Sequence, residues 1–294
     1  MNPPPSTPAP VQIQHKVLIV KPAIKMPGNT RTDESLTDEV HGNHSLRADA
    51  GRYVKQLYPK AALTPLTKIA GEARRWHKEH TLVSKFGDLL PTAMFESYDQ
   101  HMKAFQNRFH GAVENFVADF PNIMDEARRM HNGTFRADFY PPQALVSQEF
   151  SFTIFTSPMA RAHDVMVDHL AEHRVQQIRE ELEQAAAHAA QEATRQVMAR
   201  ILEKVEAITL RLGDDDAVFR DTLIGNLKDI LDMAPAMNIA ADPALSALIS
   251  ECRVKLLTAP ATLRASVSAR RTTCHRARDI SKRFGAMGGR KLAA

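Results

Sequence analysis

Two histidines and a glutamate lie close together in the segment His169-Leu170-Ala171-Glu172-His173. Residues four apart share one face of a helix, so His169 and His173 would reach the same zinc ion. Glu172 would then activate a bound water, as in the inverted zincin pattern H-x-x-E-H. The alternative is a polar, solvated helix face, because the pattern is short and the chain has 13 histidines. We favour the alternative and predict neither a zinc hydrolase nor a bound cofactor.

Nucleophilic catalysis has no recognisable motif in this chain. The sequence contains no G-x-S-x-G, no P-loop and no Rossmann glycine run. Cys252 falls on an apolar helical face and is interpreted as a core residue. Cys274 lies among arginines, whose charge favours a thiolate, so a redox or nucleophilic role is a less favoured alternative. We therefore expect a protein that is not an enzyme.

The last 34 residues hold nine of the chain's 38 Lys and Arg residues and a single carboxylate, Asp279. This basic tail therefore carries about +8, which leaves about −4 for the rest of a chain of formal charge +4. Arginine is commoner than lysine in this tail, and its guanidinium suits bidentate contacts with phosphate. The tail also contains an aromatic ring that could stack on an unpaired base. The predicted nucleic-acid-binding residues are Arg264, Arg270, Arg271, Arg276, Arg278, Lys282, Arg283, Phe284, Arg290 and Lys291. Contact with an acidic partner, including the body of this chain, and a merely solubilising role are the alternatives.

A long helix is predicted over residues 158–212, which contain no glycine and no proline after Pro158. Ser157 would cap its start, and Gly213 would end it in the left-handed conformation. Apolar residues recur along it at helical spacing, from Val175 to Leu212. An unbroken helix of this length would extend roughly 80 Å, so it must pack along another long helix. A second copy of the chain is the simplest supplier, and we expect a coiled coil that drives self-association.

The remaining periodicities predict a mainly α fold of the α+β type with a small β element. Strands are expected at residues 11–21, ended by Pro22, and within 147–156. Residues 26–50 are expected to form a mobile loop. Helices are predicted from Pro65 to about His80, along a heptad seam ending near Phe120, and over 124–130. Further helices are predicted from Asp214 to Pro235 and from Asp242-Pro243 to about Leu256, with a partly helical spacing beyond Pro260.

The predicted domain organisation follows these elements. It comprises a disordered Pro-rich leader (1–10), an α+β domain (11–157), the long helix (158–212), a helical region (213–260) and the basic tail (261–294). The first residues lack a charged segment followed by an apolar run, so we expect no signal peptide. No apolar stretch approaches the roughly 18 residues needed to span a bilayer. With only two cysteines, these features predict a cytoplasmic protein with no membrane contact.

Residues from about 43 to 159 resemble an uncharacterised domain-of-unknown-function family of phage and plasmid proteins. The resemblance rests on a Lys-Leu segment, an Arg and a His before Thr-Leu, Leu-Leu-Pro, an aromatic-studded helix and a Phe-rich strand. In this chain these are Lys55-Gln56-Leu57, Arg74 with His77, Thr81-Leu82, Leu89-Leu90-Pro91, Tyr98 to Phe120, and Phe150-Ser151-Phe152 to Ser157-Pro158. The family usually has a Trp after Thr-Leu, where this chain reads Val83-Ser84-Lys85-Phe86. The resemblance implies a mobile-element origin, often among replication or recombination genes, and some related proteins are encoded beside AAA+ ATPases.

Together these patterns predict a non-enzymatic phage accessory protein that binds DNA through its basic tail in replication or recombination. Single-stranded DNA is the favoured form. The alternative is a structural or adaptor protein whose long helix docks an AAA+ ATPase or builds an assembly.

Overall fold

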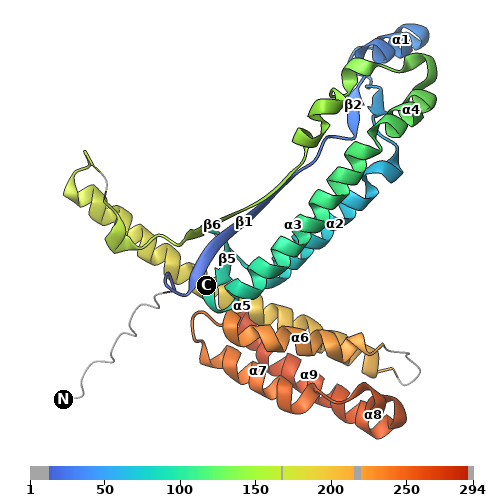
Figure 1. Cartoon of the computed structure of the whole chain (residues 1–294). Coiled ribbons are helices and arrows are strands. Elements are labelled where there is room, and N and C mark those ends of the chain that lie inside the picture. Colours follow the sequence, from blue (N-terminus) through green and yellow to red (C-terminus); the bar gives the residue numbers. More distant parts are fainter. Residues whose placement is uncertain (1–12, 167, 215–219, 291–294) are drawn as a thin grey trace, which may run out of the picture. The chain divides into compact units, whose positions relative to one another are not determined.

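A computed structural model describes residues 13–166, 168–214 and 220–290, with side chains as far as Gly285. The chain is mainly helical with a small antiparallel sheet, as predicted (Figure 1). Its residues gather into two compact units. Unit 1 takes its described residues from 13–20, 80–96 and 156–290, and unit 2 from 21–79 and 97–155. The units therefore interleave along the chain, whereas the division predicted from the sequence was consecutive. The predicted leader lies outside the described residues.

The larger sheet has the strand order β4-β5-β1-β6. Its strands are β1 (Val17–Lys25), β4 (Leu82–Ser84), β5 (Gly87–Pro91) and β6 (Ser151–Pro158). β1 runs antiparallel to β5, from Val17 opposite Pro91 to Val20 opposite Asp88. The β4–β5 hairpin turns at Gly87, whose φ of 117° is open to glycine but strained for other residues. A side chain there would also meet a methyl group of β1 at 3.1 Å.

The first predicted strand is confirmed over residues 17–21, but its bounds differ from those predicted. The strand was expected over residues 11–21 and ended by Pro22, but β1 begins at Val17 and continues through Pro22. Proline has no N–H to donate, but β5 pairs with β1 only as far as Val20, so no β5 carbonyl requires that donor. The second predicted strand, within 147–156, is confirmed as β6.

The longest helix, α5 (Glu172–Leu212), begins later than the sequence predicted. Ser157 and Pro158 were expected to start this helix, but they are the last two residues of β6. Residues 162–164 then form a short 3-10 turn, η5 (Ala162–Asp164), before the helix starts. The predicted end at Leu212 is confirmed. Gly213 follows with φ of −78°, so the helix does not end in the left-handed conformation that was expected.

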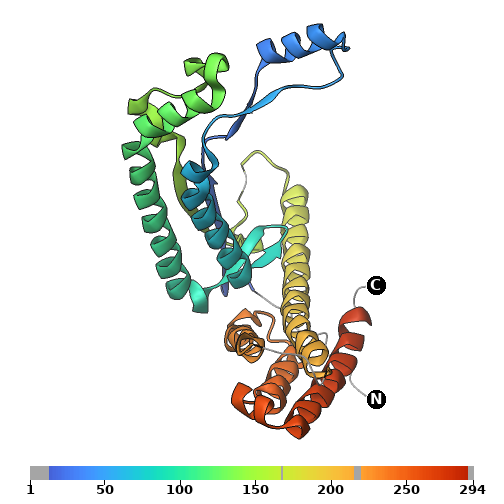
Figure 2. The same ribbon diagram turned by 90° about the vertical axis from the view of Figure 1, so that its right-hand side faces the viewer.

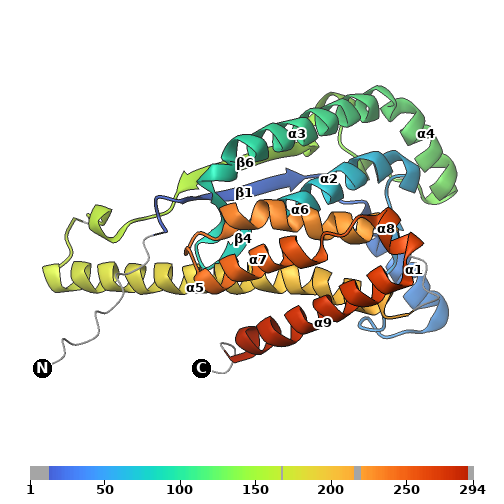
Figure 3. The ribbon, with the colours of Figure 1, turned by 90° about the horizontal axis from the view of Figure 1, so that it is seen from below.

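The apolar stripe of α5 packs against helices of the same chain in unit 1. These helices are α6 (Thr222–Met237), α7 (Pro243–Leu256) and α9 (Val267–Arg290). The short helix α8 (Pro260–Ala265) packs against α9. Figures 2 and 3 show α9 and α7 lying beside α5. Val197, Ile201, Val205 and Ile208 are completely buried in the resulting core. From Ala186 onward the buried residues of the stripe belong to the core of unit 1, so a second copy is not needed to cover this part of the helix.

The helices that follow α5 largely match their predicted boundaries. α7 begins after Asp242, whose carboxylate accepts a hydrogen bond from the Leu245 N–H at 2.9 Å, and Pro243 occupies its first turn. α6 runs past Pro235, its predicted end, and stops at Met237. The predicted start of this helix after Asp214 falls on residues outside the described part of the chain.

Unit 2 contains α2 (Lys60–His80), α3 (Phe95–Ala118) and α4 (Phe120–His131), and a 3-10 turn, η1 (Thr92–Met94), precedes α3. α2 and α3 lie side by side in Figure 1, and Arg108 of α3 pairs with Glu72 of α2 at 2.7 Å. The predicted seam of α3 is largely confirmed. Its buried members are Tyr98, Met102, Phe109 and Phe116, while Phe105 and Ala112 are half-buried.

The interpretation of residues 26–50 as a loop was wrong. They contain β2 (Thr30–Thr32) and α1 (Glu34–His44), and β2 pairs antiparallel with β3 (Val54–Gln56). Asp33 caps α1 by accepting from the Leu36 N–H, a signal present in the sequence. The segment between α4 and β6 forms three 3-10 turns, η2 (Asn132–Thr134), η3 (Ala137–Phe139) and η4 (Gln143–Glu149). Within the described residues, no helix is long and apolar enough to cross a membrane.

Candidate nucleic-acid interface

The basic tail is folded into helices α8 and α9 and is not a loose arm. One face of these helices joins the core of unit 1 through Leu263, Cys274, Ala277, Ile280 and Phe284. Gly285, Gly288 and Gly289, near the end of the tail, lie within α9. An apolar residue every three or four positions explains this packing, because that spacing lines one side of a helix. The cations of the tail are thereby held in fixed positions.

The described cations of α9 lie mostly on its solvent face. Arg271, Arg278 and Lys282 are exposed and follow one another at intervals of seven and four, so they form one stripe. Arg276 and Arg283 are also exposed and lie seven apart, so they form a second stripe. Both stripes lie on the exposed side of α9, and we call the cations Arg271, Arg276, Arg278 and Lys282 on that side the basic face of α9. At 1.5 Å per residue it extends about 16 Å along the helix.

Several cations of the tail pair with groups of the same chain. Arg264 forms an ion pair with Asp221, and Arg283 forms one with Glu251 of α7. The single carboxylate of the tail, Asp279, lies 3.0 Å from Nδ1 of His275. The pairs of Arg264 and Arg283 correspond to the alternative in which the tail contacts the acidic body of its own chain, whereas the Asp279 pair lies within the tail.

The remaining cations of the tail differ in their exposure and in their partners. Within the described residues, neither Arg276 nor Lys282 forms an ion pair. Arg278 places a guanidinium nitrogen 4.0 Å from the sulfur of Cys274. Arg270 is half-buried at the start of α9. The side chain of Arg290 and all of Lys291 lie outside the described part of the chain.

Phe284 does not face solvent, although the sequence suggested it for stacking on a base. Its side chain is 5% exposed and packs in the core. The guanidinium of Arg283 lies 5.2 Å from the ring centroid. While α9 keeps its packing, a base cannot reach this ring. Phe284 therefore gives no support for a preference for single-stranded DNA.

Glu251 and Lys255 of α7 belong to the same surface, and neither was predicted from the sequence as a site residue. The Nζ atom of Lys255 lies 2.6 Å from Oε1 of Glu251, and Arg283 donates to the same oxygen. Burial raises the pKa of Glu251, but the hydrogen bonds from Lys255 and Arg283 outweigh it and hold that pKa below its ordinary value. The four-residue spacing of Glu251 and Lys255 is a recognisable helical pair. The approach of Arg283 is a tertiary contact with no local signal.

The candidate zinc site does not have the geometry that was inferred for it. Glu172 is the first residue of α5, and His169 lies before it in a turn with φ of 66°. His169 and His173 therefore do not share a helix face, so the spacing argument fails. No group of three or more potential metal ligands occurs among the residues that the structure describes.

The two cysteines lie in the core of unit 1. Cys252 is fully buried, as predicted, and burial raises the pKa of its thiol to about 12. Cys274 is 6% exposed, and its thiol donates to the carbonyl of Thr209 at 3.5 Å. A buried thiol with a backbone partner is an ordinary packing residue, which weakens the argument for a reactive Cys274.

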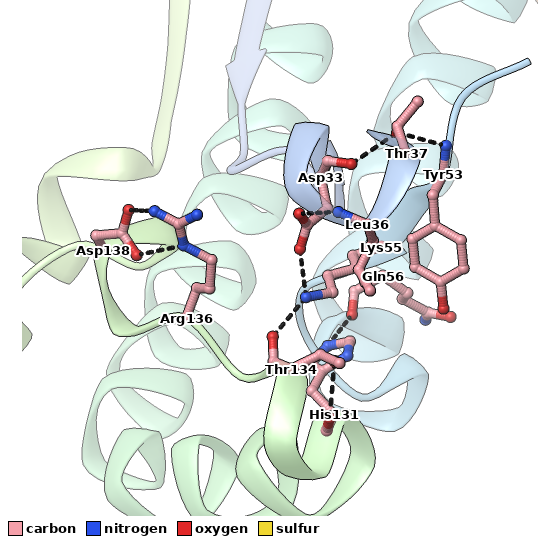
Figure 4. A network of polar contacts seen from close by, with 10 residues as sticks. All are labelled: Asp33, Leu36, Thr37, Tyr53, Lys55, Gln56, His131, Thr134, Arg136 and Asp138. Atoms are coloured by element: carbon pink, nitrogen blue, oxygen red, sulfur yellow. Dashed lines mark hydrogen bonds and ion pairs between the residues drawn. The ribbon is translucent and has the colours of Figure 1, made fainter. Parts of the chain in front are cut away.

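A second polar cluster lies in unit 2 around Lys55 and Asp33 (Figure 4). The Nζ atom of Lys55 lies 2.5 Å from Oδ2 of Asp33 and donates to the carbonyl of Thr134 at 2.5 Å. Figure 4 also shows Arg136 paired with Asp138. Every contact of Lys55 in this cluster joins it to a neighbouring segment of unit 2. The arrangement therefore ties the start of α1 to η2.

Comparisons of the chain with protein-family models, with curated proteins and with solved structures gave no match.

Proposed function

We propose that this protein binds DNA through the basic face of α9 and has no catalytic activity of its own. The observation that carries this proposal is the placement of four cations on the exposed side of a helix whose other side is anchored in the core. A phosphate backbone offers one charge per 3.4 Å along each strand, so a face about 16 Å long spans roughly five nucleotides. The planar guanidinium group of arginine can donate two parallel hydrogen bonds to the oxygens of one phosphate.

The proposed binding surface is a rigid helix, because one side of α9 is packed in the core of unit 1. Its backbone needs no ordering when the cations meet the phosphates, so only their side chains lose conformational freedom on binding. The contacts would be with phosphate and would carry no sequence information. Since Phe284 is buried, the preference for single-stranded DNA has no aromatic residue to support it, and both forms belong in the test.

The resemblance to phage and plasmid proteins supports the further proposal that this binding serves replication or recombination of a mobile element. The alternative role, in which the long helix docks an AAA+ ATPase, depends on a free apolar stripe along α5. From Ala186 onward the buried residues of that stripe belong to the core of unit 1. DNA binding is therefore the better-supported proposal.

The experiment is a fluorescence-anisotropy titration of the whole chain against labelled single- and double-stranded oligonucleotides over a series of salt concentrations. In the variant Arg276→Gln/Lys282→Gln, we expect affinity at 150 mM salt to fall at least about tenfold. The slope of log affinity against log salt should also decrease in magnitude by about 2, because each neutralised phosphate contributes about 0.9.

The matched control is Lys204→Gln/Lys228→Gln, which removes the same charge from α5 and α6. Both lysines lie beside carboxylates, Glu203 and Asp232. This control should bind DNA within twofold of the wild type. Equal losses in both double variants would show a net-charge effect without a site, and a wild-type protein that fails to bind either DNA form would refute the proposal.

A further inference from the structure

Glu251 holds two cations from two helices on one oxygen atom. Lys255 reaches Oε1 of Glu251 from one turn further along α7, and Arg283 reaches the same atom from α9. The Glu251 side chain is only 13% exposed, whereas those of Lys255 and Arg283 are 46% and 53% exposed. The anion is thus nearly enclosed, while the cations around it remain open to solvent.

This cluster adjoins the basic face of α9. Arg283 follows Arg276 by two helical turns on the same stripe, about 10 Å further along the helix. Lys255 extends the positive surface from α9 to α7, because it shares a partner with Arg283. A backbone lying along Arg276 and continuing past Arg283 would meet these two cations next.

We propose that Lys255 and Arg283 form an additional phosphate-binding site for the nucleic-acid backbone, which Glu251 occupies as an internal competitor until a phosphate displaces it. This inference rests on the DNA binding proposed above and names a further part of the same interface. The ligand is one phosphodiester group, whose charge and oxygen acceptors match those that Glu251 offers.

The competition has a simple electrostatic basis. A phosphate that approaches Lys255 and Arg283 meets repulsion from Glu251 and must take over hydrogen bonds that the carboxylate already accepts. The depressed pKa of Glu251 keeps this carboxylate ionised at neutral pH, so the competitor is present under ordinary conditions. Removing its charge should therefore strengthen DNA binding, although the variant loses an ion pair.

The chain supplies a matched control for that substitution. Asp232 of α6 bridges Lys228, four residues earlier, at 2.5 Å and Arg253 of α7 at 3.4 Å. Like Glu251, Asp232 pairs with a lysine four residues away on its own helix and with an arginine of a second helix. Neither of these partners of Asp232 belongs to α9. Asp232→Asn changes the net charge by the same amount as Glu251→Gln.

The test measures the DNA affinity of Glu251→Gln and Asp232→Asn by anisotropy with the same oligonucleotides at 150 mM salt. We expect Glu251→Gln to bind at least about fivefold more tightly, with a salt slope steeper by between about 1 and 2. Asp232→Asn should stay within twofold of the wild type. In Glu251→Gln/Arg283→Gln most of the gain should disappear, because the freed arginine is its source.

The outcomes separate this inference from the proposed function. Wild-type binding with no gain in Glu251→Gln, or equal gains in Glu251→Gln and Asp232→Asn, would overturn the phosphate site alone. A gain that survives Arg283→Gln would also overturn it. Failure of the wild type and all variants to bind DNA would refute the proposed function and this site together.

Circular dichroism melting checks that each variant is folded. If Glu251→Gln is unfolded, Glu251→Asp keeps the charge but shortens the side chain by one methylene, which weakens its reach to Arg283. It should give a smaller gain of about twofold, and no gain in that variant would count against the site.

Discussion

The Nζ atom of Lys55 lies 2.5 Å from Oδ2 of Asp33, and both side chains are almost completely enclosed, with exposures of 3% and 2%. Asp33 also caps α1 through its other carboxylate oxygen, and Lys55 also donates to the carbonyl of Thr134. The pair therefore joins three segments of unit 2 that are far apart in the sequence. A buried pair of this kind is sensitive to the loss of either member, because the remaining charge stays out of contact with water.

Substitution of Lys55 should destabilise unit 2 strongly. Lys55→Met would leave the Asp33 carboxylate buried without its cation, and we expect a loss of roughly 3–5 kcal/mol in the free energy of unfolding. The control is Lys103→Met, because Lys103 pairs with Asp99 at 2.6 Å on the exposed side of α3. That substitution should cost about 0.5 kcal/mol or less. Urea denaturation followed by circular dichroism measures both, and similar losses would contradict the assignment.

The same pair predicts a pH dependence of stability. The hydrogen bond from Lys55 outweighs burial and holds the pKa of Asp33 below its ordinary value. A lowered pKa means that the stabilisation is fully present above about pH 4 and is lost as the pH falls through the folded-state pKa. The difference in unfolding free energy between the wild type and Asp33→Asn should therefore be large at pH 7 and shrink towards pH 2. A difference that stays constant over this range would show that Asp33 does not titrate as inferred.

Deletion of the basic tail should unfold unit 1 and not merely remove a binding arm. A chain ending at residue 259 loses the buried side chains of Leu263, Ile280 and Phe284, each contributing about 1.5–3 kcal/mol. That loss is comparable with the 5–15 kcal/mol that stabilises a typical protein. We expect the truncated chain to lose its cooperative thermal transition for unit 1, as measured by calorimetry. An unchanged transition would show that α8 and α9 are dispensable for folding.

A conservative substitution of Phe284 tests whether the ring serves the core or a ligand. Phe284→Leu keeps the site apolar and should cost less than about 1.5 kcal/mol, as measured by urea denaturation. A leucine cannot stack on a base, so the affinity for single-stranded DNA should remain within twofold of the wild type. Removal of a stacked base costs about 1–3 kcal/mol. A loss of affinity on that scale would show that the ring of Phe284 contacts the DNA.

Much of the helical framework was predictable because its signals are local. Asp242 and Pro243 mark the start of α7, and the structure shows both the cap and the first-turn proline. Asn132 directly follows α4 and adopts a positive φ of 44°, a conformation that asparagine tolerates better than most residues. The alternation of Phe150, Phe152 and Ile154 indicated the strand that became β6. In each case the residues that set the structure are neighbours in the chain.

Predictions failed where a distant partner decided between two local possibilities. Ser157-Pro158 reads equally well as a helix start and as the end of a strand, and the pairing of β6 in the sheet selects the strand. Residues 26–50 look like a polar loop, yet β2 pairs with β3 and Asp33 reaches Lys55. The long apolar stripe of α5 required a partner, but its spacing did not show whether that partner was a second copy or α9.

The sequence by itself determined that the end of this chain is strongly basic and that its cations recur at helical intervals. Only the tertiary structure decided that these residues form a packed helix, that Phe284 is buried, and that Arg283 shares Glu251 with Lys255 while Arg276 and Lys282 face solvent. The physical reason is that charge and periodicity are properties of neighbouring residues. Burial and ion pairing depend instead on which distant elements the hydrophobic core brings together.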